Sequence, residues 1–352
     1  MQESYVKALK KEIENFPYTE EYRVSTVFFG GGTPSILPAD MICGLLRVMR
    51  DKFSFNTDTE ISIECNPGTA DDEKLASYRA AGINRLSIGL QSADDKELAL
   101  LGRIHTWEDF RRTYELAEKA GFSNINVDLM SALPGQTSAS WERTLRRVLD
   151  MRPQHISAYS LIVEEGTPFY ETYHEDVKRR DRGDTPKFLP SEEEERRMYR
   201  LTEQLLSEAG LHRYEISNYA LPGYECRHNK GYWQGTDYVG FGLGASSLLH
   251  HSRYRNPAGM AEYLAGDFSG RECEVLTMED QMEEFMFLGL RLMEGVREQE
   301  FSDRFGIRIE EVYGEVLRRQ EELGLLKRNG ARIYLTPRGI DLSNTVMAEF
   351  LL

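Results

Sequence analysis

Three consecutive glycines, Gly30 to Gly32, follow an apolar run and precede Thr33 and Pro34 in the stretch "VFFGGGTPSILPAD". A single glycine there would serve a tight turn, because glycine adopts positive φ angles at little cost. Three in succession leave backbone amide and carbonyl groups that a ligand can approach without meeting side chains. The third glycine of the dinucleotide-binding fingerprint is missing. We therefore predict a binding site for the polar end of another small ligand.

Further polar side chains stand in or just after apolar runs that are typical of strands. They are Glu64 in "EISIECNPG", Gln91 after "RLSIGL" and Asp128 in "INVDLM". An acid inside an otherwise apolar strand is either paired in the core or directed at a ligand. Arg103 in "LGRIHT" suits a carboxylate, because the planar guanidinium binds one bidentately. An exposed helix arginine is the alternative interpretation of Arg103.

His228 lies in the segment "CRHNKGYW", close to Tyr232 and Trp233. Histidine is a common axial ligand of heme iron, and aromatic neighbours suit a flat macrocycle. The alternative is a histidine whose ring nitrogens are satisfied by hydrogen bonds between a loop and the rest of the fold. The residues alone leave both interpretations open.

Six short apolar runs would position these residues, at 24–29, 60–65, 84–90, 124–130, 155–161 and 213–217. Amphipathic stretches with helical spacing lie between them, and one opens with Ser191 and Glu194, which predicts a capping box. Strands that alternate with helices pair in parallel, so the fold class is α/β. An open doubly wound sheet and a barrel both satisfy this pattern. We favour a complete or partial (β/α) barrel, because several strands each contribute a polar residue near their carboxyl ends.

The pattern divides the chain into three parts. Residues 1–225 would form the barrel, and residues 226–276, rich in glycine, tyrosine and asparagine, a loop-rich segment packed on it. Residues 277–352 are helical again and include a hairpin with Asn329-Gly330 as its turn. Three helices and a two-stranded wing are typical of a winged-helix domain. Because this part has 15 acidic against 10 basic residues, we predict a packing or protein-contact role there.

The composition argues against several classes of protein. A net charge of −15 disfavours a nucleic-acid backbone as the main partner. No apolar run approaches the ~18 residues of a membrane helix, and the first residues lack the apolar centre of a signal peptide. The four cysteines are too scattered for a disulfide framework. These features predict a cytoplasmic protein without an integral membrane segment.

Five motifs follow one another along the chain: "FFGGGTP", "EISIECNPGT", "GINRLSIGLQS", "LGRIHT" and "NVDLMSALPGQT". In this order and spacing they resemble the oxygen-independent coproporphyrinogen III oxidase family of radical S-adenosylmethionine (SAM) proteins. The resemblance covers nearly the whole chain. The segment "RHNKGYW" is similar to the signature of the HemW branch of that family, whose members are regarded as heme chaperones. The resemblance implies a partial (β/α) barrel of radical SAM type with a winged-helix-like C-terminal domain.

The resemblance also implies a SAM site at the carboxyl ends of the barrel strands. Gly31, Gly32 and Thr33 would contact the methionine end, and Glu64 would accept hydrogen bonds from the ribose or the ammonium group. The glycines of "VGFGLGASS" would let that segment approach the ligand. The whole set carried over from the family is Gly31, Gly32, Thr33, Glu64, Gln91, Arg103, Asp128, Ile162 and Ser246 for SAM, with His228 for heme.

One feature departs from the family. Radical SAM enzymes hold a [4Fe–4S] cluster on a C-x-x-x-C-x-x-C loop, and an electron from the cluster cleaves SAM to a 5′-deoxyadenosyl radical. The cysteines here lie 22, 161 and 47 residues apart and cannot hold one local cluster. In the family, the cysteine loop precedes a helix resembling "SYVKALKKEIENF", which here stands almost at Met1.

Either the chain starts late or the cluster has been dropped. We therefore expect a barrel without its first strand, an exposed edge at or near residues 24–29, and no radical chemistry from the chain as printed. Three functional hypotheses follow. The first is a HemW-like chaperone that binds heme and delivers it to acceptor proteins. The second is a coproporphyrinogen oxidase, and the third is an inactive chain that retains a SAM-shaped cleft. The segment "HNKGYW" favours the first over the second.

Overall fold

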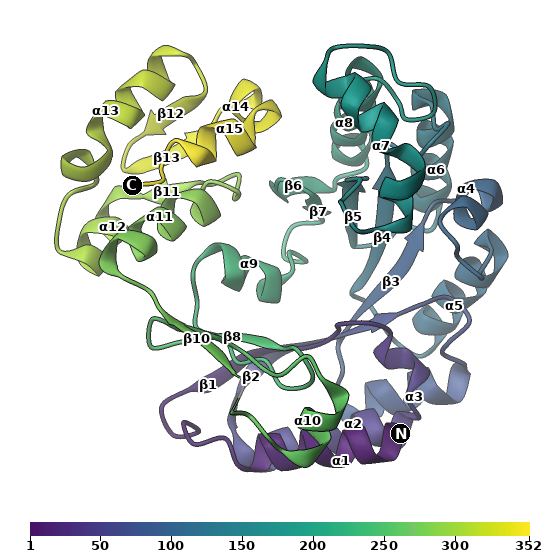
Figure 1. The fold of residues 1–352 in the computed structure, drawn as a ribbon. Coiled ribbons are helices and arrows are strands. Elements are labelled where there is room, and N and C mark those ends of the chain that lie inside the picture. Colours follow the sequence, from purple (N-terminus) through teal and green to yellow (C-terminus); the bar gives the residue numbers. More distant parts are fainter. Residues whose placement is uncertain (270) are drawn as a thin grey trace.

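The computed structural model describes residues 1–269 and 271–352. Its largest sheet has seven strands, which curl into an open half-barrel (Figure 1). In spatial order they are β1 (Arg23–Phe29), β2 (Ser54–Cys65), β3 (Arg85–Gln91), β4 (Ile125–Ser131), β5 (His155–Ser160), β7 (Asn218–Ala220) and β6 (His212–Glu215). The prediction of an α/β fold with a partial barrel is confirmed.

Strands β1 to β5 run parallel to one another, as the alternating pattern predicts. The strand predicted at residues 213–217 behaves differently, because β7 lies between it and β5. Strand β7 is antiparallel to both of its neighbours. The carboxylate of Glu215 accepts hydrogen bonds from the Ser217 amide and the Asn218 side chain, which stabilises the tight turn between β6 and β7. That turn brings in a short strand that the sequence pattern did not predict.

Helices cover the convex face of the sheet (Figure 1). Leu86 and Ile88 of β3 point to this side and share one hydrophobic core with residues such as Trp141 of α6. Within the described residues, no helix is both long and apolar enough to cross a membrane. The helices up to residue 208 are α1 (Gln2–Glu14), α2 (Ala39–Lys52), α3 (Asp72–Ala81), α4 (Asp95–Leu100), α5 (Trp107–Lys119), α6 (Ser138–Asp150), α7 (Pro168–Asp181) and α8 (Glu192–Glu208), with a 3-10 turn at Pro34–Ile36.

Strand β1 is an edge of the sheet and has β2 as its strand partner. The expected sheet edge is thus present, but most of its residues are half-buried or buried, and Thr26 contacts His228 of the segment 226–276. The following segment contains more regular structure than its weak periodicity predicts: α9 (Arg227–Trp233), β8 (Ser246–Leu249), β9 (Ser252–Arg255), α10 (Met260–Ala265) and β10 (Glu272–Val275). Helix α9 lies on the concave side of the sheet (Figure 1).

The C-terminal part has a hydrophobic core of its own, which includes Phe301, Tyr313 and Ile333. The predicted hairpin at Asn329-Gly330 is present as β12 and β13. The helical stretch after the hairpin is broken near Leu342 into two short helices. The elements are α11 (Met278–Gly289), β11 (Val296–Arg297), α12 (Glu298–Phe305), α13 (Ile309–Glu322), β12 (Leu326–Asn329), β13 (Arg332–Leu335), α14 (Pro337–Asp341) and α15 (Ser343–Ala348).

Of the two hydrogen bonds that form the capping box predicted at the start of α8, only the first is present. Ser191 accepts a hydrogen bond from the Glu194 amide, as an N-cap should. The Glu194 carboxylate instead accepts hydrogen bonds from the amide and hydroxyl of Ser138, in the first turn of α6. These two bonds lower the pKa of Glu194. A neighbouring helix N-terminus thus offers a carboxylate better partners than its own helix does.

Candidate functional site

A cavity of about 1170 Å³ extends from the concave side of the half-barrel past the edge strand β1 to helices α1 and α2. Most small-molecule sites measure roughly 300–1,000 Å³, so this cavity has room for a large ligand. Inward-facing polar side chains of β1 to β5 and residues of α9 line one part of it. Apolar residues of α1, α2 and the segment 236–249 line the other part. Six of the ten predicted site residues line the cavity, namely Gly31, Thr33, Glu64, Asp128, His228 and Ser246.

The three positions after β1 are glycine for two different structural reasons. Gly31 and Gly32 have φ angles of +80° and +143°, and a Cβ atom on either would meet no atom within 4 Å. Their backbone is therefore open, as a cradle for a ligand requires. A Cβ on Gly30 would lie 2.6 Å from a ring carbon of Phe28 and 3.1 Å from the Glu64 carboxyl carbon. Gly30 is thus required by packing, and the other two by backbone conformation.

Two carboxyl groups, Glu64 and Asp128, share the polar part of the cavity. Burial, helped by the negative charge of Asp128, raises the pKa of Glu64 to about 7, while the Gly31 amide acts against this. Burial also raises the pKa of Asp128, although Asn126 and Ser87 donate hydrogen bonds to it. A cation between two such groups favours their ionised forms. The sulfonium and ammonium groups of SAM have this charge, so the residues fit SAM.

Four predicted site residues do not line the cavity: Gly32, Gln91, Arg103 and Ile162. Gln91, at the end of β3, is buried at a φ angle of +71° and, within the described chain, its Oε1 has no hydrogen-bond partner. Backbone strain and an unsatisfied buried acceptor are both typical of ligand sites. Burial lowers the pKa of Arg103, against the charge of Asp128. Ile162 is 75% exposed.

The glycines before Ser246 pack against the protein itself. A Cβ on Gly240 would overlap the backbone oxygen of Ser246, and a Cβ on Gly242 would lie 2.7 Å from the Tyr5 hydroxyl. Contacts within the protein therefore explain Gly240 and Gly242 without a ligand. Ser246 itself begins β8 and lines the cavity.

Helix α9 carries the "RHNKGYW" segment into the cavity, and Glu60 of β2 anchors its N-terminus. The two carboxylate oxygens of Glu60 accept hydrogen bonds from the amides of Arg227 and His228, at 3.0 and 3.1 Å. A carboxylate at a helix N-terminus is favoured by the helix dipole. Glu60 is buried, so these bonds also satisfy a charge that water cannot reach.

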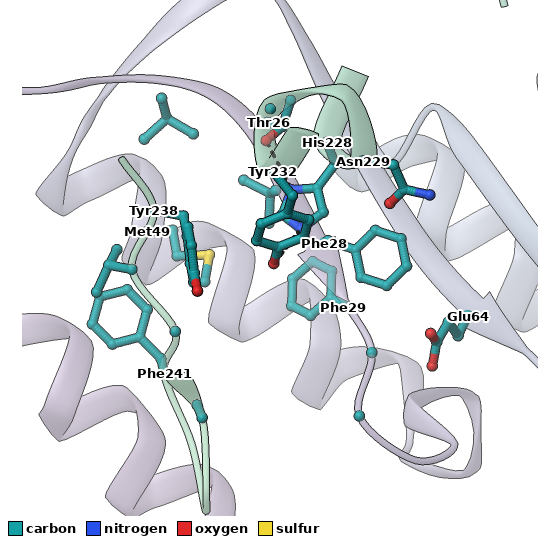
Figure 2. A pocket seen from close by; sticks show the side chains of 18 of the residues that line it. Thr26, Phe28, Phe29, Met49, Glu64, His228, Asn229, Tyr232, Tyr238 and Phe241 are labelled. Atoms are coloured by element: carbon teal, nitrogen blue, oxygen red, sulfur yellow. Dashed lines mark hydrogen bonds between the residues drawn. The ribbon is translucent and has the colours of Figure 1, made fainter. Parts of the chain in front are cut away.

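Two hydrogen bonds and one stacked aromatic ring fix the position of the His228 ring. Its Nδ1 lies 2.9 Å from the Thr26 hydroxyl and its Nε2 lies 3.1 Å from the Tyr232 hydroxyl. The ring stacks on Phe28 at a centroid distance of 4.9 Å, as Figure 2 shows, with Glu64 on the far side of Phe28 in that view. Burial lowers the pKa of His228 to about 4, so the ring is neutral at pH 7. A bond to iron would require the exchange of one of these two hydrogen bonds.

A buried chain of hydrogen bonds, which sequence reasoning missed, joins Asp128 to α9. Asp128 accepts from the Asn126 amide, and the Asn126 oxygen faces His155 Nδ1 at 2.6 Å. The Nδ1 atom must therefore carry the proton, which leaves Nε2 to accept from Tyr214, 2.8 Å away. Burial lowers the pKa of His155 well below its ordinary value, in keeping with a neutral ring. The Cys226 amide, which precedes α9, donates to the Tyr214 hydroxyl.

The cysteines do not fit an iron–sulfur cluster. They lie on separate elements, and Cys65 and Cys226 are buried, whereas Cys273 is exposed. Across the two described ranges, no three His, Cys, Asp or Glu side chains are placed to hold a metal ion. We derive no step through a cluster held by these residues.

Comparisons with known proteins agree with this architecture. Residues 2–148 match the Radical SAM superfamily and residues 276–342 match the HemN C-terminal domain. The chain is 35% identical over 352 residues to the heme chaperone HemW of Lactococcus lactis, which covers 99% of this chain and 90% of that protein. The chain belongs to the HemW family. HemW of Bacillus subtilis is also 35% identical, over 99% of this chain and 91% of that protein.

The fold of this chain is also similar to that of an enzyme of known structure. Coproporphyrinogen III oxidase (HemN) from Escherichia coli, a radical SAM enzyme, superimposes with a TM-score of 0.81 at 25% sequence identity. The match covers 99% of this chain and 83% of that enzyme. The resemblance inferred from the five motifs and from "RHNKGYW" is therefore confirmed for both the family and its HemW branch.

Proposed function

We propose that this chain is a heme chaperone, which binds heme and delivers it to acceptor proteins. The observation that carries the proposal is the 35% identity to HemW heme chaperones over nearly the full length of both chains. The site supports it, because the HemW-like segment forms α9, and α9 presents His228 and Tyr232 to a cavity of about 1170 Å³. The scattered, free cysteines support a cytoplasmic location.

Heme is proposed to occupy the part of the cavity around Phe28, His228 and Tyr232. These rings form a stacked and edge-on group that suits a flat macrocycle. His228 is neutral at pH 7, so a ring nitrogen has a lone pair for iron once it exchanges its protein partner. Nε2 is the better candidate, because its partner, the Tyr232 hydroxyl, lies on the same short helix and can turn away with a change of rotamer.

SAM is proposed to bind at the carboxyl ends of the strands. Gly31, Gly32 and Thr33 would receive its methionine end through open backbone groups, and Glu64 and Asp128 would balance its positive charges. In the family, SAM supplies a 5′-deoxyadenosyl radical when a reducing cluster is present. The residues of this chain bind and orient the ligand. The further members of the proposed SAM set are Gln91, Arg103, Ile162 and Ser246.

Heme titration tests the main proposal. We expect the chain to give a saturable Soret band, and the heme-loaded chain to convert apomyoglobin to the holoprotein faster than a weak, non-specific heme carrier does. His228→Ala should weaken heme binding at least tenfold, whereas the control His174→Ala, on α7, should bind as the unchanged chain does. Absence of heme binding would refute the function, and unchanged affinity in His228→Ala would remove only the proposed ligand.

The oxidase is the second candidate, favoured by the TM-score of 0.81 to HemN. Its reaction depends on a cluster that these four cysteines do not fit. We therefore expect no loss of coproporphyrinogen III when the chain is incubated anaerobically with iron, sulfide, reductant and SAM. Release of CO₂ from the substrate under these conditions would reverse the order of the two candidates.

A further inference from the structure

Arg85 is the first residue of β3, and its side chain lies inside the half-barrel. Side chains alternate along the strand, so Arg85 and Ser87 face the cavity, while Leu86 and Ile88 face the helices. Arg85 is only 2% exposed to solvent. It therefore forms part of the floor of the cavity, at the opposite end of the strands from the Gly31 loop.

Within the described chain, the Arg85 guanidinium forms no ion pair, and its buried Nε has no hydrogen-bond acceptor. The nearby carboxylates are engaged elsewhere. Glu60 accepts from the first amides of α9, and Asp128 accepts from Asn126 and Ser87. Although burial acts against it, the charges of Glu60 and Asp128 still favour the cationic form of Arg85, so its pKa is raised. Among the described residues, the buried Nε nevertheless lacks an acceptor, and a buried donor without an acceptor is costly. The guanidinium therefore has donors to offer to a group that comes from outside the chain.

The chemistry of that group follows from the guanidinium. Its planar fork of donors matches a carboxylate, which it can bind through two parallel hydrogen bonds. Arg85 lies near the level of His228 in the barrel, because Arg85 pairs with Ser62 of β2, and Glu60, two residues earlier on β2, accepts a hydrogen bond from the His228 amide. The Gly31 loop, where a methionine carboxylate is expected, lies beyond Phe28 at the other end of the strands.

We infer that Arg85 is an anion subsite on the cavity floor that binds a carboxylate of the occupant, namely a propionate of heme. This inference rests on the proposed heme function and adds to it the contact that orients the macrocycle. The heme would lie against Phe28 and Tyr232, with one propionate directed at the floor. The carboxylate of SAM is the other source of the same chemistry, and the experiment separates the two.

The experiment compares heme with heme dimethyl ester, in which both propionates are esterified. We expect the unchanged chain to bind heme at least tenfold more tightly than the ester. Arg85→Gln should bind the two equally, and Arg85→Lys should retain part of the preference, because a lysine keeps the charge without the fork. Affinity for SAM should stay within twofold in all of them. The control is Arg213→Gln, which removes a buried arginine that already pairs with Glu203 and should keep the preference.

The outcomes separate the possibilities. A chain that binds heme without preferring it to the ester overturns the inference and leaves the heme function standing, whether or not the variants fold. A preference that persists in folded Arg85→Gln also overturns it. Loss of SAM affinity in that variant, with the heme preference intact, assigns the carboxylate to SAM. A chain that binds neither porphyrin overturns the proposed function together with the inference.

Discussion

The pH dependence of SAM binding follows directly from Glu64. If the ionised carboxylate is required, the affinity should scale with the ionised fraction. With a pKa of about 7, this fraction is roughly 0.9 at pH 8 and 0.1 at pH 6, so the affinity should fall about tenfold, or about 1.4 kcal/mol. A carboxyl group with its ordinary pKa of 4.5 would be ionised at both values and give almost no change.

Isothermal titration of SAM at pH 8, 7 and 6 measures this effect. The control is Glu64→Gln, in which any titration of SAM itself persists while that of Glu64 is gone. We expect Glu64→Gln to bind more weakly than the unchanged chain at pH 8 and to show a nearly flat pH profile. A tenfold fall that persists in Glu64→Gln, or a flat profile in both proteins, would refute the reasoning.

The same shift has an effect without ligand. The folded chain holds the Glu64 proton more tightly than the unfolded chain does, since its pKa is raised from 4.5 to about 7. The group therefore stabilises the fold below pH 4.5, and this contribution is lost as the pH rises through 7. From pH 5 to pH 8, the unfolding free energy of the unchanged chain should thus fall relative to that of Glu64→Gln.

Three further predictions concern the frame of the site. Gly32→Ala places a side chain at a φ angle of +143° and should cost about 1–3 kcal/mol of unfolding free energy, measured by urea titration, with weakened SAM binding. Glu60→Gln removes one charged acceptor from the α9 amides and should cost about 1.5–3 kcal/mol, with faster hydrogen exchange of the His228 amide. Arg291→Ala removes a guanidinium that lies 4.3 Å from the Trp233 ring and should lower the unfolding free energy by about 1–2 kcal/mol. An unchanged midpoint of urea unfolding would show that this contact is dispensable.

Much of the barrel could be predicted from the sequence because its strands are local apolar runs. The predicted run at residues 24–29 is β1 almost to the residue, and residues 155–161 differ from β5 by one. Gly31, Thr33, Glu64 and Asp128 converge because the carboxyl ends of parallel strands meet at one edge. What the pattern missed were features fixed by distant partners, such as the carboxylate of Glu194 at α6.

Arg85 shows the same limit in the site itself. In the segment "NRLSIGLQ", the pattern indicates only that Arg85 is a charged residue just before an apolar strand. The signal that could have found it is the polar or small residue at every second position, Arg85, Ser87, Gly89 and Gln91, which marks one face of the strand as different from the other. The predicted barrel gave that face an inside, but the contacts of Arg85 depend on distant segments such as α9, which no local pattern encodes.

Helix α9 is the clearest case of structure made by its surroundings. It has seven residues, whereas isolated helices of fewer than about 12–15 residues are marginal in water. The barrel holds its first turn through Glu60, and the C-terminal part holds its last residue, Trp233, under Arg291. The segment that resembles the HemW signature therefore becomes a helix only where the two cores meet. Its histidine faces the cavity because both ends are fixed, so a ligand that moves His228 must also act on the contacts between the barrel and the C-terminal part.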